Sequence, residues 1–221
     1  MRRILTVAVV AALLTTTAWV VHGAAAGSAR TAGASPPAAA SPGPPTDERA
    51  LERGVRTIKP ASLATQLARA RLATGKYATS LRAAKADGYG IITRMIPSMG
   101  YHFMNPNVKG FDIRKPQILV YEHRGTTWQL GALEWVFPKI PAKPPIPGAR
   151  YGVFGAACHY LDGTVVFADS QDKCAAQSPT TGAKFNFWHG NLVTLHIWLW
   201  YPNPSGLFAG TNPLATPFDR G

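Results

Sequence analysis

The sequence predicts an α+β fold in which a long basic amphipathic helix packs on an antiparallel β-sheet within a single domain. Apolar residues between positions 63 and 84 recur at steps of three and four, which is the period of a helix. After Tyr89 the pattern changes to short apolar runs separated by turn signals, which is typical of strands. The 221 residues, 46% of them hydrophobic, suffice for one domain with a substantial core.

The first 26 residues are predicted to be a secretory signal peptide. Arg2 and Arg3 precede an apolar run from Ile4 to Val21, and small residues follow it as they do at a cleavage site. We therefore expect a secreted or extracytoplasmic protein. The apolar run is close to the length that spans a bilayer, so an uncleaved N-terminal membrane anchor is the alternative.

Residues 27–46 are rich in Ala, Pro, Ser and Gly and are predicted to form a disordered linker. The globular domain then spans residues 47–221. A short helix is expected to begin at Asp47 and to end before Pro60.

The long helix is predicted from one continuous apolar stripe, with Ser62 as its N-cap, Gly88 at its end and a possible kink at Gly75. The stripe consists of Leu63, Leu67, Ala70, Thr74, Tyr77, Leu81 and Ala84. Basic residues lie off this stripe, namely Arg69, Arg71, Lys76, Arg82 and Lys85.

Two hairpins are predicted in the remainder of the chain. Strands at 118–123 and 127–137 flank Arg124 and Gly125, and strands at 157–161 and 164–168 flank Asp162 and Gly163. The intervening segment 138–148 contains five prolines and is expected to be a surface loop.

A final strand is predicted at 192–200, before a turn at 203–206. Alternation places Val193, Leu195, Ile197 and Leu199 on a core face. It places Thr194, His196, Trp198 and Trp200 together on the opposite face, which has the composition of a pocket lining.

The formal net charge of +12 is concentrated early in the chain, since residues 49–115 hold 13 of the 23 Lys and Arg residues. For an exported chain this favours an anionic cell-wall polymer or a lipid surface as a partner, and no nucleic acid. A solvated helix face without a partner is the simpler interpretation.

The two cysteines, Cys158 and Cys174, are expected to form one disulfide, as befits an even count in an exported protein. A cysteine-based metal site is the alternative, although His159 is the only further ligand close in sequence.

Three titratable residues in apolar surroundings form the candidate site: His102, Glu134 and His196. A carboxylate is rarely buried without a partner, so Glu134 predicts a nearby donor, cation or cavity. Two imidazoles and one carboxylate suit zinc or iron(II), and a thioether from Met99 or Met104 would favour copper.

Two other interpretations of these residues remain open. In the first interpretation, the two histidines are buried and hydrogen-bonded without a metal, and Glu134 pairs with one of them or with an arginine. Alternatively, Trp135, Trp198 and Trp200 form a stacking platform for a small organic or saccharide ligand, lined also by Tyr101 and Met104.

No residue is assigned a catalytic role, and whether the protein is an enzyme stays open. Ser98, Ser170 and Ser205 lack the sequence context of a nucleophile elbow. His189 is expected to be exposed, with a role as a further ligand from the loop before His196 as the alternative, and His123 and His159 are expected to be structural.

The ordered motifs MGYHFMNP, LEWVFP and LHIWLWYPNPSGLF resemble a family of exported bacterial proteins of the actinobacterial type that are usually labelled hypothetical. The resemblance covers about residues 74–214 and includes His102, Glu134 and His196. It implies no activity, substrate or cofactor. It also implies that the loop between Cys158 and Cys174 belongs to a subset of the family.

Overall fold

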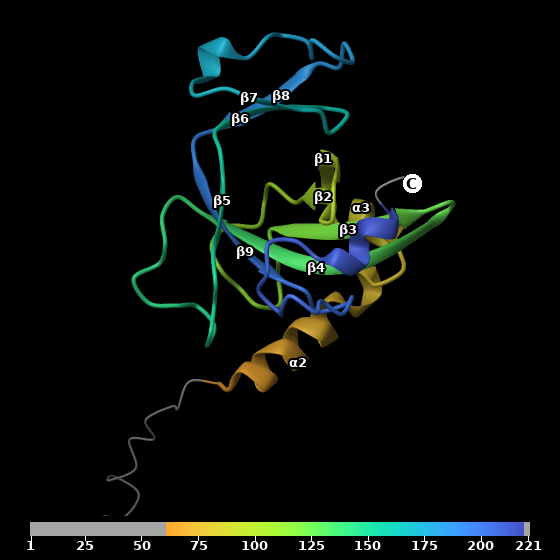
Figure 1. The fold of residues 1–221 in the computed structure, drawn as a ribbon, viewed down its shortest axis with the longest axis vertical. Coiled ribbons are helices and arrows are strands. Elements are labelled where there is room, and N and C mark those ends of the chain that lie inside the picture. Colours follow the sequence, from red (N-terminus) through yellow and green to blue (C-terminus); the bar gives the residue numbers. More distant parts are fainter. Residues whose placement is uncertain (1–60, 219–221) are drawn as a thin grey trace, which may run out of the picture. The chain divides into compact units, whose positions relative to one another are not determined.

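Two antiparallel β-sheets and a few short helices make up residues 61–218, the part of the chain that the computed structural model describes (Figure 1). These residues belong to one compact unit. The predicted signal peptide 1–26, the linker 27–46 and the short helix before Pro60 lie outside them. Within 61–218 no helix is both long and apolar enough to cross a membrane.

The basic helical region is divided in two, so the prediction of one long helix is wrong. Helix α2 spans Leu63–Thr74, a single 3-10 turn η1 spans Gly75–Tyr77, and helix α3 spans Leu81–Ala86. Ser62 caps α2 as predicted, because its hydroxyl accepts the Thr65 N–H at 3.2 Å. Ser80 does the same for the Ala83 N–H at 3.2 Å, so a second helix begins there.

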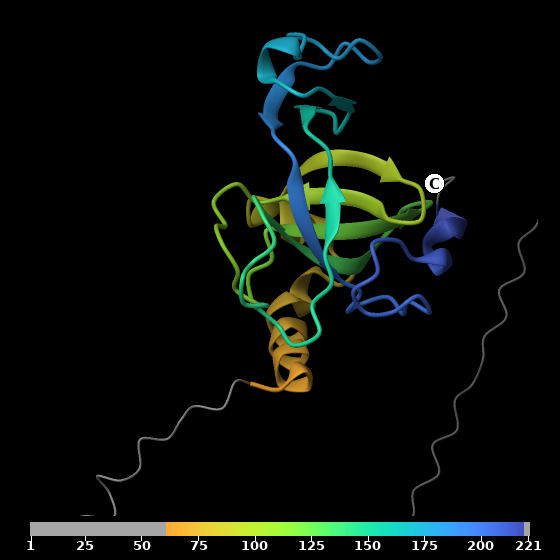
Figure 2. The ribbon, with the colours of Figure 1, turned by 60° about the vertical axis from the view of Figure 1, so that its left-hand side comes forward.

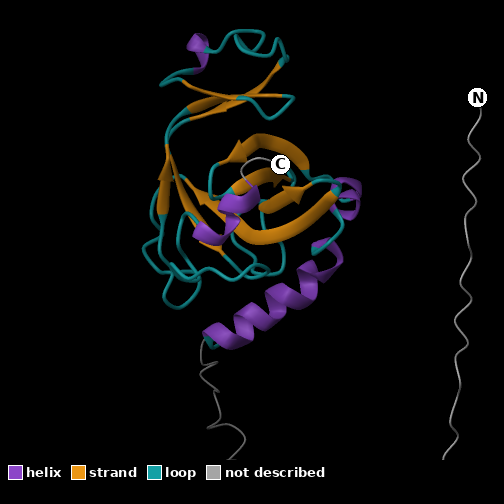
Figure 3. Cartoon of the chain, turned by 45° about the vertical axis from the view of Figure 1, so that its right-hand side comes forward, coloured by secondary structure: helices purple, strands orange, loops and turns teal. Residues whose placement is uncertain are grey.

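The predicted apolar stripe nevertheless faces the core through both helices. Leu63 and Leu67 are partly buried and pack against the core. The other residues of the stripe are buried, namely Ala70, Thr74, Tyr77, Leu81 and Ala84. All five basic residues off the stripe are exposed. Figure 3 shows α2 on the side of the larger sheet away from the smaller one.

The larger sheet has six strands in the order β1-β2-β3-β4-β9-β5, and every neighbouring pair is antiparallel. The first four strands are connected in sequence, and they curve strongly in Figure 2. Their bounds are β1 Gly90–Ile96, β2 Gly100–Met104, β3 Ile118–Arg124 and β4 Thr127–Phe137, followed by β5 Gly152–Phe154 and β9 Leu192–Ile197. The hairpin predicted around Gly125 is thus confirmed.

The second predicted hairpin is confirmed as well, but it belongs to a separate sheet rather than to the single sheet expected. This sheet has the order β7-β6-β8, with β6 Ala157–Tyr160, β7 Val165–Phe167 and β8 Phe185–His189. Gly163 turns the hairpin with φ of 81°, a conformation that favours glycine. The disulfide between Cys158 and Cys174 is confirmed and ties the 3-10 turn η2, Gln171–Lys173, to β6.

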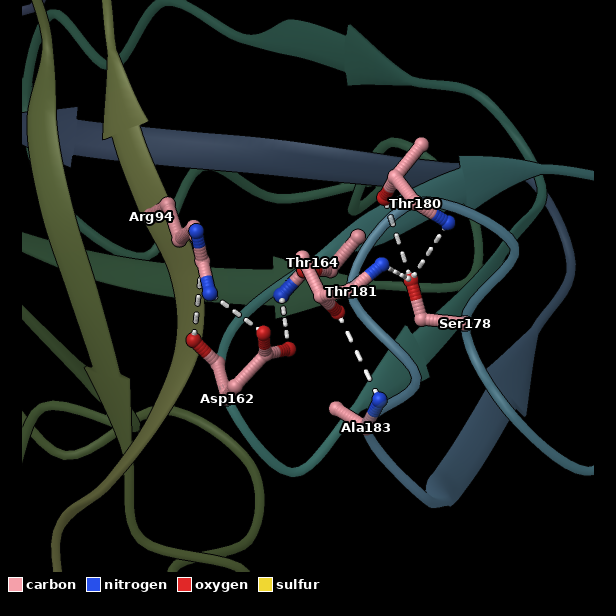
Figure 4. A network of polar contacts seen from close by, with 7 residues as sticks. All are labelled: Arg94, Asp162, Thr164, Ser178, Thr180, Thr181 and Ala183. Carbon is pink, nitrogen blue, oxygen red and sulfur yellow. Dashed lines mark hydrogen bonds and ion pairs between the residues drawn. The ribbon is translucent and has the colours of Figure 1, made fainter.

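Polar contacts join the two sheets through β1 (Figure 4). The Arg94 backbone N–H donates to the Gly163 carbonyl at 2.8 Å, and its guanidinium forms an ion pair with Asp162. The same carboxylate accepts the Thr164 N–H at 3.0 Å and so also closes its own turn. The sheets are therefore held by a backbone bond as well as by a surface ion pair.

The six-stranded sheet has two different faces, because neighbouring residues of a strand point to opposite sides. The helix face carries the larger core, which includes Tyr121, Leu133, Trp135, Leu195 and Ile197 together with the helical stripe. The other side, which we call the pocket face, carries a smaller apolar cluster of Ile92, Ile118, Val120, Ala132 and Trp198.

Two irregular segments complete the fold. The proline-rich segment 138–148 contains no helix or strand, as predicted, but its Ile146 is fully buried in the helix-face core. A 3-10 segment η3, Pro213–Phe218, ends the described chain.

Candidate metal centre

Strands β2, β4 and β9 bring the three predicted residues together on the pocket face. Glu134 and His196 are direct partners across the β4–β9 ladder. His102 reaches them from β2, on the other side of β3. All three side chains are about 95% buried, and their ligand atoms lie within 4.8 Å of one another. The predicted convergence of His102, Glu134 and His196 is confirmed.

The distances within this triad match shared coordination better than hydrogen bonding. His102 Nε2 lies 3.5 Å from Glu134 Oε2, and His196 Nε2 lies 3.5 Å from Glu134 Oε1. A good hydrogen bond from nitrogen to oxygen is about 2.7–3.2 Å long. Two ligands about 2.1 Å from one tetrahedral ion lie about 3.4 Å apart. Each contact from an imidazole nitrogen to a Glu134 oxygen therefore has the length expected between two ligands of one ion, and one ligand atom from each residue lies within 4.8 Å of the others.

Two of the triad's buried polar atoms have no hydrogen-bond partner among the described residues: Glu134 Oε2 and His196 Nε2. An unsatisfied buried polar group costs about 1–3 kcal/mol. A metal ion at the centre of the triad would satisfy both atoms at once.

Thr93 orients the imidazole of His102 from the neighbouring strand β1. Its Oγ1 lies 2.8 Å from His102 Nδ1 and also accepts the His102 backbone N–H at 3.2 Å. With Nδ1–H donating to this hydroxyl, the lone pair of Nε2 faces Glu134. Such a contact fixes the orientation of a metal-binding histidine ring.

Burial keeps the metal-free triad uncharged near neutral pH. Burial lowers the pKa of His102 to about 3, and repulsion from His196 adds to this effect. It also lowers the pKa of His196 to about 4 and raises the pKa of Glu134 to about 8. The close contacts are therefore not ion pairs at pH 7. A cation would reverse this balance by favouring the carboxylate.

The triad opens into a pocket of about 210 Å³ between the two sheets. Its wall combines aliphatic, thioether and aromatic side chains with a second pair of histidines. They include Ile92, Ile96, Met99, Met104, Ile118, Val136, Phe154, His159, Phe187 and His189. The prediction that Met104 lines the pocket is confirmed.

The predicted tryptophan platform is not formed. Trp135 is fully buried on the helix face, where its Nε1–H donates to the Asp112 carbonyl. Trp198 lies on the pocket face but within the smaller apolar cluster, and its Nε1–H donates to the Ala209 carbonyl. Trp200 packs toward the helices and donates to Thr74 Oγ1. None of the three lines the pocket.

The end of strand β9 explains the divergence of Trp198 and Trp200. The strand ends at Ile197 rather than at residue 200, and the N–H groups of Trp200 and Tyr201 both donate to the Gly131 carbonyl. Regular alternation therefore stops before Trp200. The predicted lining residue Tyr101 is also misplaced: it packs on the helix face, edge-on to Trp128 at 5.1 Å.

Sequence reasoning missed the pairing of His159 with His189, since His159 was expected to be structural and His189 was considered a ligand only as the alternative to exposure. Instead His159 is buried and His189 half-buried, and both line the pocket. A signal was present in the stretch FNFWH, because Phe187 and His189 must share one face of a strand. The third histidine considered, His123, stacks on Trp128 outside the pocket.

Comparisons with protein-family models, with curated proteins and with solved structures gave no match. The resemblance to exported hypothetical proteins therefore stays a prediction, and the function is argued from the geometry of the pocket.

Proposed function

We propose that this chain is an exported metal-binding protein in which His102, Glu134 and His196 hold one divalent ion, with zinc the best-suited metal. The observation that carries the proposal is the pair of 3.5 Å contacts from Glu134 to two buried imidazoles. Among residues 61–218, Glu134 Oε2 and His196 Nε2 have no hydrogen-bond partner. The two contacts have the spacing expected for ligands of one ion.

The donor set supports zinc because two imidazoles and a carboxylate are common zinc ligands, with a fourth position left for solvent or substrate. The same set suits iron(II). Met99 and Met104 line the same pocket, so copper is the third metal that the donors accommodate. Elemental analysis of the native protein distinguishes the three.

The pocket supports a small organic ligand that binds the metal through an oxygen or nitrogen atom. Its apolar wall, with Ile92, Ile96 and Phe187, suits the body of such a molecule. A saccharide has less support, because none of the three tryptophans predicted to stack on it lines the pocket.

Export is supported by the disulfide between Cys158 and Cys174, since disulfides persist in oxidising compartments. Binding of an anionic wall polymer or lipid by the basic helices stays a prediction. Three of their five cations are engaged within the fold: Arg71 donates to the Leu199 carbonyl, Lys76 pairs with Asp87, and Lys85 lies over the Phe103 ring.

The test is the metal content of untagged protein purified without chelator. We expect zinc to be bound, and both His102→Ala and His196→Ala to lose one equivalent per chain. His123→Ala is the matched control, because His123 lies outside the pocket, and it should retain the full content. Equal metal content in the His196→Ala variant and the wild type would contradict the proposal.

A further inference from the structure

A second pair of nitrogen ligands faces the same pocket from the three-stranded sheet. His159 lies in β6 and His189 is the last residue of β8. Their Nε2 atoms are 3.0 Å apart. Neither residue belongs to the triad, so this pair is a separate feature of the pocket wall.

Backbone carbonyls fix the tautomer of both rings. His159 Nδ1 lies 2.7 Å from the Ile92 carbonyl oxygen, and His189 Nδ1 lies 2.6 Å from the Gly190 carbonyl oxygen. A carbonyl oxygen only accepts, so each Nδ1 must carry the hydrogen. In two neutral rings, both Nε2 atoms then present lone pairs to each other. A cation between them removes this conflict.

A proton shared between the two Nε2 atoms is the competing cation, and direct zinc titration distinguishes the two. The apolar rings of Phe187 and Phe154 surround the pair, with Phe187 stacked on His159 at 4.5 Å and Phe154 at 5.6 Å from His189.

A metal ion fits the same geometry. Two imidazole nitrogens about 2.0–2.1 Å from a tetrahedral zinc ion lie about 3.3 Å apart. The observed 3.0 Å is slightly shorter and has the length of a hydrogen bond, but two neutral rings whose Nδ1 atoms both carry the hydrogen cannot form one. The separation is too short for linear coordination of copper(I) by two imidazoles, which needs nearly twice one metal–nitrogen bond. Metal-binding histidines usually donate a hydrogen bond from the ring nitrogen that does not bind the metal, and both Nδ1–H groups make such a bond to a backbone carbonyl here.

We propose that His159 and His189 are ligands of a second zinc-type divalent ion, so that one pocket takes two metal ions on its facing walls. The remaining coordination positions of this ion face the pocket and are filled by solvent or by donor atoms of a bound molecule. This inference goes beyond the proposed function and does not depend on it, because the two ions have different ligands. Repulsion between the ions should make the second zinc bind more weakly than the first.

The experiment is zinc titration of chelator-stripped, untagged protein, followed by equilibrium dialysis and isothermal titration calorimetry. We expect two equivalents for the wild type and for the control His123→Ala. We expect one equivalent for His189→Ala, one for His196→Ala and none for the double variant. His189 is suited to substitution because it is half-buried at a strand end.

The outcomes separate the two sites. One equivalent in the wild type that survives in His189→Ala and is lost in His196→Ala would overturn this inference and leave the proposed function intact. One equivalent lost only in His189→Ala would support this inference and contradict the proposed function. If His189→Ala does not fold, the second site is tested in the wild type through the nitrogen NMR signals of His159 and His189. Shifts of both Nε2 signals on adding the second zinc equivalent support the site, and unchanged signals overturn it.

Discussion

Within residues 61–218, buried polar groups on the two faces of the six-stranded sheet include atoms with hydrogen-bond partners and atoms without them, and the triad atoms contrast with several groups of the helix face. On the helix face, Tyr121 Oη donates to the Tyr77 carbonyl and Tyr89 Oη to the Pro116 carbonyl, while Trp135 Nε1 donates to the Asp112 carbonyl. On the pocket face, Glu134 Oε2 and His196 Nε2 are equally buried but lack such partners among the described residues.

The difference separates groups that stabilise the fold from groups that serve a ligand. A buried polar atom with a backbone partner contributes to stability or costs little. A buried atom without one persists in a folded protein when something else is gained, and the gain that we propose here is a ligand set for a metal ion. The two faces come from the same strands, so neighbouring residues provide matched tests of the comparison.

The largest expected effect comes from neighbouring residues of β9. Leu195→Ala on the helix face should lower the free energy of unfolding by about 2–5 kcal/mol, because it leaves a cavity in the core, while the metal content stays unchanged. His196→Ala on the pocket face should cost less stability in metal-free protein but lose one zinc. Urea unfolding with chelator, combined with metal analysis, checks both. A larger stability loss for His196→Ala than for Leu195→Ala would break the comparison.

Removing the disulfide should weaken the smaller sheet. The double variant Cys158→Ser, Cys174→Ser should lose about 3 kcal/mol of stability. The disulfide joins residues 16 positions apart, and closing a loop of this length lowers the entropy of the unfolded chain by about that amount. The measurement is urea unfolding at constant pH. Reductant should lower the stability of the wild type by a similar amount and leave the double variant unchanged. An equal effect of reductant on both proteins would contradict the prediction.

Zinc affinity at the triad should depend on pH through Glu134. Its pKa is raised to about 8, so zinc must displace a proton below that pH, and affinity should fall about tenfold per pH unit from 8 toward 5. Both triad histidines stay neutral in this range, because their pKa values are about 3 and 4. The measurement is competition with a chelator in a His189→Ala background, which leaves one site.

Glu134→Gln is the control for this pH dependence. The amide cannot titrate, so the variant should bind zinc more weakly but with nearly constant affinity between pH 5 and 8. A wild-type affinity that is equally flat over this range would show that Glu134 does not exchange a proton for the metal.

The smallest effect is expected where the two sheets meet. Arg94→Ala should cost less than about 1 kcal/mol, because its ion pair with Asp162 is exposed and screened, and the backbone bond from residue 94 to Gly163 remains. Lys173→Ala, which removes another exposed pair within the smaller sheet region, is the control. A loss of several kcal/mol for Arg94→Ala alone would show that side chains, and not only the backbone bond, hold the two sheets together.

Much of the local structure was predictable because it depends on neighbours in sequence. Turn signals at Gly125 and Gly163 located both hairpins, and the alternation in β9 placed Leu195 and His196 on opposite faces. The stripe from Leu63 to Ala84 identified the buried side of the helices although it missed their division. These features follow from backbone geometry with periods of 2 and 3.6 residues.

The amino-acid sequence by itself determined which residues share a face of a strand, where the hairpins turn, and which two cysteines pair. Only the tertiary structure decided which strands become neighbours when no short turn joins them. Pairing of β4 with β9 places Glu134 beside His196, and a second sheet turns His159 and His189 toward the same pocket. The tertiary structure also ended β9 at Ile197, because the backbone N–H groups of Trp200 and Tyr201 donate to the Gly131 carbonyl. Trp200 therefore lies on the helix face. The physical reason is that local periodicity fixes the direction of a side chain, whereas strand order and register depend on contacts between segments far apart in the chain.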